Sequence, residues 1–499
     1  MGITDRLKGG ARKVGGTVKA ARSIVREGLR AAGVRAKYEA GSRRKRLRDW
    51  TGDKTSIDTE TRRSLGLIRQ RSRDLVANHW AASRAKSVIQ RNVVGSGIRP
   101  TVKGDASERM HEAVADFCCT TKLDPARRKT LYALQELIMG AIVESGEVLV
   151  VRQRRTSAQM RQLGLDLPLQ IAVLEPDYLD PLVDGPLQNG NRSIQGVEID
   201  PDTGAVVAYH LYRQHPGDVY HPRAMETIRV DARHVIHAFE EIRPGQSRGL
   251  PWGVSALIKM RDLSDYEDAQ LVKQKVAAAF AAFVHHQEPY NLDDLYDPDG
   301  VPTTMQPGTV EYLRPGEDVT FSDPPRIDGF KDFSEVSVRA IAAAYNVTYE
   351  ALASDYSNVN FSSGRMGWLE MQRHVDSWQG DLLIPQVCHR IEGWIREAAA
   401  DVGIDPSGPR WKWTPPRREM IDPSSEVNAS IRAVRGGLNS LSDEIRKLGR
   451  DPAEVFEEIA DDYELMDALG IVLDSNASQT TQAGLTPTAV TQEMHQEEQ

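Results

Sequence analysis

The sequence predicts a protein of the α+β class, mainly helical with one β-rich layer. Apolar residues recur every three or four positions over residues 59–92 and over much of the chain after residue 251, which is the period of a helix with one buried face. Between residues 148 and 239 this period gives way to short β-branched and aromatic runs bounded by Gly, Pro and Asp, which are typical of strands. A hydrophobic content of 40% over 499 residues is enough for one or more cores and excludes a disordered polymer.

The first elements in chain order are a basic segment and a pair of helices. Residues 1–50 are rich in Gly, Ala, Lys and Arg, which predicts a flexible basic arm reaching to residue 58. A solvated helix packed on the body through the apolar residues of 24–29 explains this composition equally well. The period over 59–92 predicts two successive helices, which end at residues 93–100, where two glycines and a proline follow.

Two more helices, at residues 107–119 and 130–144, precede the β-rich layer. Asp200-Pro201-Asp202-Thr203-Gly204 lies between two strand-like runs and predicts a hairpin turn, because Pro fixes φ and Gly adopts the conformations that other residues avoid. The strand-like runs cover residues 148–151, 169–174, 194–199, 205–212 and 228–239.

The clearest helical pattern covers residues 251–284, about thirty residues that would span ~45–50 Å at ~1.5 Å each. Its apolar residues share one side, and Lys259, Arg261, Lys273 and Lys275 lie mostly off that side. A loop-rich insert follows over residues 285–330, with seven prolines and a short strand pair expected around 309–321.

The rest of the chain predicts helices with a polar break between two of them. The Pro-rich joint at residues 406–416 separates the longer helices from a small helical unit. Residues 474–499 are acidic and rich in Thr, Gln and Ala, which predicts disorder. The expected elements are helices at 333–352 and 362–401, the break at 353–361, and helices at 424–449 and 452–469.

Charge is distributed unevenly along the chain, although the net value is only −8. Residues 1–50 carry 15 Lys/Arg against 4 Asp/Glu, residues 51–450 carry 48 against 55, and residues 451–499 carry none against 12. The chain therefore has a basic head, a mildly acidic body and an acidic tail. A basic segment of this kind is typical of contact with nucleic acid or with an acidic partner.

Cysteine usage and hydropathy favour a soluble cytoplasmic protein. Cys118, Cys119 and Cys388 are an odd number with two adjacent, which does not fit the disulfide framework of a small secreted scaffold. The longest apolar stretch, residues 276–284, is about half of the ~18 residues that a membrane span needs. The N-terminus lacks the apolar core of a secretion signal.

A search for catalytic, cofactor-binding and metal-binding patterns predicts none of these sites. No phosphate-binding G-x-x-x-x-G-K-[S/T] string occurs in the chain. His234 and His237 stand three apart in a strand-like run, where they would point to opposite faces, so structural histidines are favoured over ligands. Buried cysteines are likewise favoured over a nucleophile at Cys118 and Cys119. The acidic pairs, which favour solvated faces, are Asp293/Asp294 and Asp461/Asp462.

Three strings in the right order resemble lambda-type phage portal proteins. Asn360-Phe-Ser-Ser-Gly-Arg365, followed by Glu370, Arg373 and Pro385, is similar to the family's N-Y-S-S-x-R…E…R…P signature, with Phe361 in place of tyrosine. Trp413-Thr-Pro415 to Pro452 resembles its W-x-x-P…D-P-x-K-E…G-x-x-S…G-x-D stretch, with Ser425 in place of lysine. Residues 71–100 resemble its R-x-R-D-L…N-V-V-G-x-G-I-x-P segment. Together the strings cover roughly residues 60–470.

The resemblance implies a portal protein fold that assembles as a ring, expected to be a dodecamer, at one vertex of a tailed-phage or phage-like capsid. The implied parts are a basic flexible arm at 1–58, a wing of helices plus a β layer at 59–250, a stem helix at 251–284, a clip at 285–330, a second stem helix at 331–352, a tunnel loop at 353–361, a long wing helix at 362–405, a helical crown at 406–470 and a disordered acidic tail at 471–499.

The resemblance also implies partners and a location. Double-stranded DNA would pass through the ring during packaging and ejection, and the terminase large subunit and then a head-tail adaptor would dock on the clip. A major capsid protein or scaffold would surround the ring, which would be assembled in the host cytoplasm and become part of the virion. Neither an enzymatic activity, a cofactor nor a membrane is implied.

A DNA channel has to let phosphates slide past, so few cationic contacts are expected along it. On this basis Ser357, Asn358 and Asn360 of the tunnel loop are expected to touch DNA without reading bases. Lys273 and Lys275 are candidate cations of the stem helix. The basic arm is expected to bind capsid, scaffold or packaged DNA. The residues of the family motif are Asn360, Ser362, Ser363, Arg365, Glu370 and Arg373.

Two other classes of protein fit parts of the sequence. A metal-dependent nuclease would use the acidic pairs and histidines, with the basic arm as its DNA anchor, and would be a monomer or dimer. A membrane-peripheral scaffold would use the basic N-terminal segment to bind lipid. Microscopy of the purified protein separates these classes, since rings with a central hole are expected of a portal alone.

Overall fold

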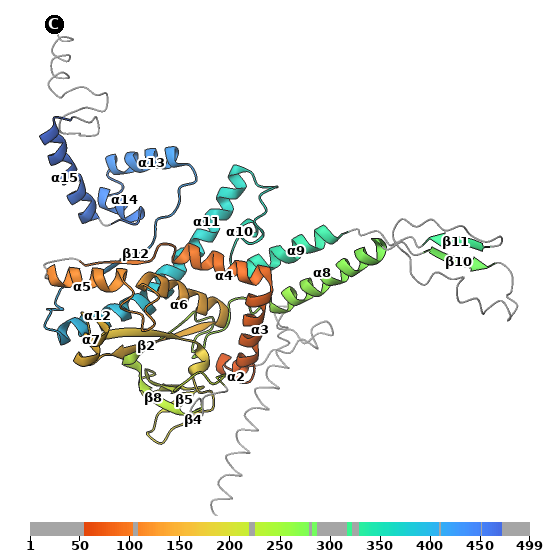
Figure 1. Ribbon diagram of the computed structural model, residues 1–499, viewed down its shortest axis with the longest axis horizontal. Helices are drawn as coiled ribbons and strands as arrows, with labels where there is room; N and C mark the ends of the chain where they lie inside the picture. Colours follow the sequence, from red (N-terminus) through yellow and green to blue (C-terminus); the bar gives the residue numbers. More distant parts are fainter. Residues whose placement is uncertain are drawn as a thin grey trace, which may run out of the picture. The chain divides into compact units, whose positions relative to one another are not determined.

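The computed structural model describes most of the chain between residues 54 and 471 (Figure 1). The chain divides into two compact units, Met1–Ser56 and Ile57–Gln499, and every element below belongs to the second. The expected arm and acidic tail, and the pair Asp293/Asp294, lie almost wholly outside the described residues. The described ranges are 54–102, 108–218, 225–278, 282–286, 317–321, 329–408, 411–450 and 452–471.

The two successive helices predicted near the start of the second unit are confirmed. His79 separates them because its backbone is extended, with φ −112° and ψ 120°. Its Nδ1 accepts a hydrogen bond from the Ala81 N–H at 3.1 Å, which caps the second helix. Gly95 and Gly97 then turn the chain with positive φ, as the sequence predicts. The elements are α2 (Ile57–Thr61), α3 (Leu65–Asn78), α4 (Trp80–Val93) and the strand β1 (Arg99–Thr101).

The next two predicted helices are α5 (Glu108–Cys119) and α6 (Leu131–Ser145). α6 is bounded by local signals, because the Thr130 hydroxyl accepts from the Ala133 N–H and Gly146 ends the helix with φ 88°. A Cβ at Gly146 would lie 2.2 Å from the Leu250 carbonyl carbon, so only glycine allows this close approach. Most of α6 is buried, which makes it the central helix of the core.

Two antiparallel sheets form the predicted β layer. The three-stranded sheet has the order β3-β2-β9, and the five-stranded sheet has the order β4-β5-β6-β7-β8. The turn at residues 200–204 is confirmed, with Gly204 at φ 72° between β6 and β7. The strands are β2 (Glu147–Arg154), β3 (Leu169–Leu174), β4 (Gly185–Pro186), β5 (Arg192–Ile194), β6 (Val197–Ile199), β7 (Val206–Tyr212), β8 (Thr227–Asp231) and β9 (Val235–Phe239), with α7 (Ser157–Leu163) after β2 and the short helix η3 (Pro176–Tyr178) after β3.

Two of the strand-like runs divide differently from the expectation. The run 194–199 is no single strand, because Gln195 and Gly196 have φ of 47° and 89° and turn the chain between β5 and β6. The run 228–239 is cut by the 3₁₀ turn η4 (Ala232–His234), so that β8 and β9 join different sheets. Alternation within a run cannot show which sheet each half joins.

The helix expected over 251–284 is shorter in the structure, and its predicted C-terminal part is wrong. α8 covers Leu257–Ala278, about 33 Å at ~1.5 Å per residue, and β10 begins at Ala282. β10 (Ala282–His286) pairs antiparallel with β11 (Glu317–Phe321). One strand of the predicted pair is therefore present as β11, but its partner lies before the insert. Residues 287–316 are outside the described residues.

The next expected helix, 331–352, is two helices. α9 (Phe330–Ala344) and α10 (Tyr349–Ala353) are separated at Asn346, whose φ is 54°. α9 contacts α8, and the Tyr266 ring lies 4.5 Å from the Phe333 ring, centroid to centroid. The two helices thus run side by side on either side of the β10–β11 pair (Figure 1).

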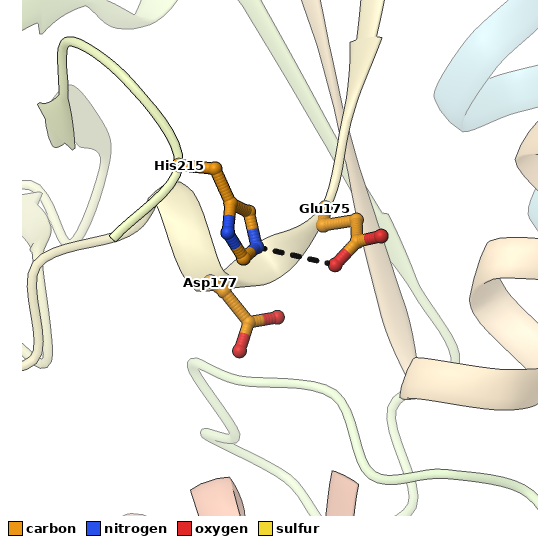
Figure 2. Close-up of side chains that lie close together, drawn as sticks. All are labelled: Glu175, Asp177 and His215. Carbon is orange, nitrogen blue, oxygen red and sulfur yellow. Dashed lines mark ion pairs between the residues drawn. The ribbon is translucent and has the colours of Figure 1, made fainter. Parts of the chain in front are cut away.

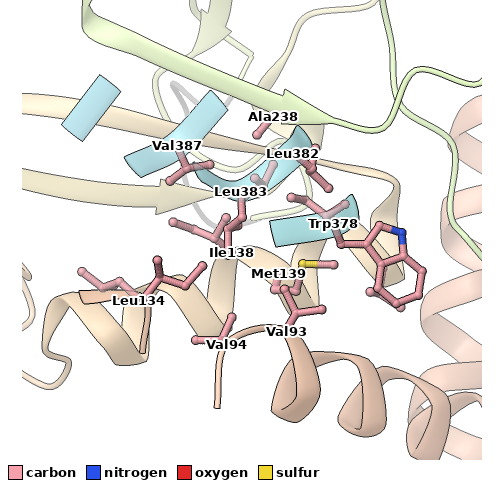
Figure 3. Packing of buried hydrophobic residues seen from close by; sticks show 14 of the residues in the cluster. Val93, Val94, Leu134, Ile138, Met139, Ala238, Trp378, Leu382, Leu383 and Val387 are labelled. Atoms are coloured by element: carbon pink, nitrogen blue, oxygen red, sulfur yellow. The ribbon is translucent and has the colours of Figure 1, made fainter. Parts of the chain in front are cut away.

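The long helix expected over 362–401 is confirmed, with an irregular middle. α11 (Phe361–Ser377) continues through a π-helical segment, η6 (Trp378–Cys388), into α12 (His389–Asp401). Pro385 lies inside η6 and has no N–H to donate, which interrupts the α-helical ladder there. Side chains of η6 pack against α4, α6 and β9, as Figure 3 shows.

The chain after residue 405 contains one strand and three helices. β12 (Lys412–Thr414), which the sequence did not predict, pairs antiparallel with β1. The predicted helical unit is present as α13 (Pro423–Arg435), α14 (Leu441–Lys447) and α15 (Pro452–Leu469).

One large apolar cluster and one smaller one hold the second unit together. The large cluster runs from Ala81 in α4 to Trp413 in β12 and includes Ile138, Leu383 and Trp394. The smaller cluster lies between the two sheets, around Leu149 and Tyr209. None of the helices in the described residues is both long and apolar enough to span a membrane.

Candidate functional site

The predicted polar break is a loop of residues 354–360 that joins α10 to α11. It begins where Ser354 ends α10 with a left-handed φ of 55°. Both flanking helices contact α4, and the Arg84 Nε donates to the Ala351 carbonyl at 3.0 Å. A cavity of about 290 Å³ lies behind the loop, with Tyr356 and Val359 among its lining residues. The loop is therefore anchored at both ends by the core.

Asp355 organises the first half of this loop. Its Oδ1 accepts the Ser357 N–H at 3.0 Å and the Ser357 hydroxyl at 2.7 Å, and its Oδ2 accepts the Tyr349 hydroxyl at 3.3 Å. The hydrogen bonds from Ser357 lower the pKa of Asp355 below its usual value. The only carboxylate of the loop is thus directed back toward its own backbone and α10.

Asn360 and Ser363 of the family motif form a capping box at the start of α11. The Asn360 Oδ1 accepts the Ser363 N–H at 2.8 Å, and the Ser363 Oγ accepts the Asn360 N–H at 3.1 Å. These bonds satisfy N–H groups that a helix end otherwise leaves without partners. The structure thereby gives Asn360 a role that the sequence analysis missed, although Asn-x-x-Ser before a helical run is a recognisable signal.

The side chains predicted to meet DNA are on the surface of the chain. Ser357, Asn358 and Asn360 are all exposed. Residues 356–364 contain no charged side chain, so the exposed part of the loop offers hydroxyl and amide groups alone. Such groups form hydrogen bonds without the strong attraction of a cation for phosphate.

The remaining motif residues lie on the first four turns of α11. Ser362 and Arg365 are exposed, and Glu370 pairs with Arg373 at 2.6 Å. Both partners of this pair are mostly in solvent, so its contribution to stability is small. Stability of the single chain therefore does not account for these charged side chains.

The two lysines predicted as stem cations are near the C-terminal end of α8. Lys275 is exposed and Lys273 is half-buried. Neither is close in sequence to the loop of residues 354–360, and α8 contacts α3 and α9. The structure does not bring these lysines and the loop into one described site.

A buried carboxylate, Glu147, is the most heavily bonded acid of the described residues. Its side chain is fully buried and pairs with Arg69, with Arg248 at 2.7 Å and with His237 at 2.9 Å. It also accepts the Gly249 N–H at 2.6 Å. Burial alone would raise the pKa of Glu147, but the charges of Arg248 and Arg69 outweigh burial and hold it well below the usual value.

This network joins elements rather than forming a reactive site. Glu147 begins β2, Arg69 lies in α3, His237 lies in β9 and Arg248 lies in the segment before α8. All its oxygens are occupied by donors of the same chain, so no substrate or ion has access. The sequence signal was a glutamate at the start of an apolar strand, which requires a buried partner. The structural role that the sequence favoured for His237 matches this arrangement.

Glu175, Asp177 and His215 form a cluster with the composition of a metal site (Figure 2). Their ligand atoms lie within 4.8 Å of one another. Arg73, however, pairs with Asp177 and lies 3.2 Å from Glu175. Burial raises the pKa of Asp177, but the hydrogen bond and charge of Arg73 outweigh it and lower the pKa. A cation would have to displace this guanidinium, so the cluster is explained by ion pairing.

Cys118 and Cys388 are buried, and burial raises the pKa of each thiol above its usual value. They have the environment of inert core residues, as the sequence analysis favoured. Cys119 is exposed, and its Sγ lies 4.0 Å from the Tyr132 hydroxyl.

Comparison with known proteins gives one family match. The chain matches the family described as phage portal protein, lambda family, over residues 43–379. That range includes α8, α9, the loop of residues 354–360 and the motif on α11.

Individual relatives are similar over most of their length. The chain is 28% identical over 452 residues to the probable portal protein of Halomonas phage phiHAP-1, covering 85% of both chains. It is 23% identical to portal protein B of Escherichia phage lambda, covering 83% of this chain and 86% of that one. Among solved structures, a chain from the neck of a native GTA particle computed with C12 symmetry is 14% identical, with a TM-score of 0.46 and coverage of 78% and 94%.

Proposed function

The chain belongs to the lambda family of phage portal proteins, and on this premise we propose that its copies form a ring-shaped channel for double-stranded DNA at one vertex of a capsid. The observation that supports this most strongly is the family match over residues 43–379, together with relatives that are aligned over most of their own length. In this proposal DNA enters through the ring during packaging and leaves through it during ejection. The protein acts as a conduit and docking platform in the virion, without catalysis and without a cofactor.

The proposed parts follow the elements of the structure. The loop of residues 354–360 is the tunnel loop, and its uncharged exposed groups let phosphates slide past. α8 and α9 are the stem helices, and β10 and β11 belong to the clip, where the terminase large subunit and then the head-tail adaptor dock. α2 to β9 with α11, η6 and α12 make the wing, and α13 to α15 make the crown.

Microscopy of the purified full-length protein tests the ring. Particles with a central hole and high rotational symmetry, a dodecamer in our proposal, are the expected result. Small discrete particles that cleave DNA in the presence of a divalent cation would instead establish the nuclease alternative.

Packaging by loop variants tests the contact with DNA. Asn358→Ala removes an exposed amide without touching a helix cap, so we expect less DNA packaged or retained by rings that assemble normally. Asn360→Ala should have the same defect, and Asn360→Ser, which can still cap α11, separates loss of the DNA contact from loss of the cap. Wild-type packaging and DNA retention by both alanine variants would remove the loop from the proposed channel wall.

A further inference from the structure

The helical unit of residues 421–450 and 452–471, here called the C-terminal helical unit, leaves most of its apolar side chains in solvent (Figure 1). Ile445 is the one large apolar side chain of this unit that is buried. α13 has no buried residue at all. The exposed large apolar residues are Ile421, Val427, Ile431, Leu438, Leu441, Leu448, Phe456, Ile459, Leu465, Leu469 and Ile471.

These residues form faces rather than scattered positions. Val427, Ile431 and Val434 are four and three residues apart, so they share one side of α13. Phe456, Ile459, Tyr463 and Met466 have the same spacing on α15. Ordering three helices costs conformational entropy at every residue, and burial of apolar surface is the main term that offsets it. The single chain provides little such burial here, so another surface must cover these faces.

Charge indicates which surface. Residues 417–450 carry seven Lys/Arg and five Asp/Glu, whereas α15 carries seven Asp/Glu and no Lys/Arg. Arg450 with Glu458 joins the two parts within the chain. Over the described residues, no ion pair involves the side chains of Glu457, Asp461, Asp462, Glu464 or Asp467 of α15, and none involves Arg417 or Arg432 on the other side.

We propose that the acidic and apolar face of α15 docks on the basic and apolar face of α13 and α14 in a second copy of the chain. The two faces are complementary to each other and neither is complementary to itself, so the contact is head to tail. It leaves α15 of one copy and α13 of the other available, and therefore continues from copy to copy around a closed ring. The chain's own residues 472–499 cannot take this place, because they carry four acidic residues and no basic one.

This inference rests on the proposed ring and assigns it an interface. Amide hydrogen exchange of the full-length protein, assembled and dissociated, provides the first test. We expect α13 and α15 to exchange at least roughly threefold more slowly in rings than in separated subunits. Intact rings in which both helices exchange as fast as in subunits would overturn the interface and leave the channel standing. Wild-type protein that never assembles would overturn both.

Charge reversal provides the second test. Arg432→Glu and Asp462→Lys should each lower the salt concentration at which rings dissociate and speed exchange in both helices, because each places like charges across the contact. The double variant R432E/D462K should recover much of the loss, since every copy then carries both reversed faces. Arg161→Glu on α7, exposed and outside the unit, is the matched control and should behave as wild type. Equal behaviour of R432E, D462K and R161E would contradict the proposal.

Discussion

At the scale of single residues, two buried carboxylates hold the sheets in place. Glu147 links β2 to α3, β9 and the segment before α8, as described above. Glu198 has the same role in the five-stranded sheet, where it pairs with Arg229 at 2.7 Å and with His210 at 3.0 Å. The hydrogen bond from Arg229 lowers the pKa of Glu198 to about 2, although desolvation opposes the shift. Neither carboxylate is available for chemistry, and both are sensitive to loss of charge.

Glu147→Gln should lower the free energy of unfolding by about 3–5 kcal/mol, because it leaves Arg69 and Arg248 buried without a counter-charge. Glu370→Gln breaks the exposed pair with Arg373 and should cost less than about 1 kcal/mol. Urea unfolding of the full-length chain at one fixed protein concentration measures both. Similar losses for the two variants would show that the buried network is not a stabilising element.

The same variant carries a pH signature. The pKa of Glu147 is depressed in the folded state, so its contribution is complete above the unfolded value of about 4.3 and is lost as pH falls below it. Glu147→Gln should therefore weaken the decline of stability below about pH 4.3, while the contribution of Glu198 remains. An unchanged acid profile would place the acid sensitivity elsewhere.

At the scale of elements, the sequence predicted most helices and the central strands from periodicity and turn residues. The run 169–174 coincides with β3, and Thr130 and Gly146 bound α6 as their types indicate. What failed depends on partners distant in sequence. The alanine-rich run 276–284 has helical propensity, yet Ala282–His286 pairs with Glu317–Phe321, and no local signal shows that pairing.

The candidate site was predicted in position but not in construction. The polar composition of 353–361 correctly located the loop between two helices. The roles within it depend on geometry, since Asp355 turns inward to Ser357 and Tyr349 while Asn358 stays in solvent. Composition treats these polar residues alike, and their hydrogen bonds separate them.

The capping box of α11 gives an element-scale prediction. Asn360→Ala should cost about 1 kcal/mol of stability, because it leaves the Ser363 N–H without its acceptor. Asn358→Ala, two residues away and free of any cap, should change stability by less than about 0.5 kcal/mol. Thermal unfolding of the two variants under identical conditions compares them, and equal shifts would show that the cap contributes nothing.

At the scale of the whole molecule, charge is separated along the chain in a way that suits a channel. The body is mildly acidic, the exposed loop is uncharged and the cations are concentrated in residues 1–50. We therefore expect the basic arm to bind capsid, scaffold or packaged DNA outside the channel. Deleting residues 1–48 should reduce incorporation of rings into proheads or DNA filling while the rings still form. Normal incorporation and filling would assign the arm no part in assembly.

The pairing of β1 with β12 has a consequence for synthesis of the chain. Arg99–Thr101 leaves the ribosome early, but its partner Lys412–Thr414 is translated only after the sheets, α8, α9 and the long helix. The large core likewise needs Trp394, Trp411 and Trp413 to close over α4 and α6. The nascent polypeptide must therefore carry an unpaired strand edge and uncovered apolar surface through most of translation, a state prone to aggregation. Host chaperones that hold such intermediates are expected to determine how much of the protein survives to assemble.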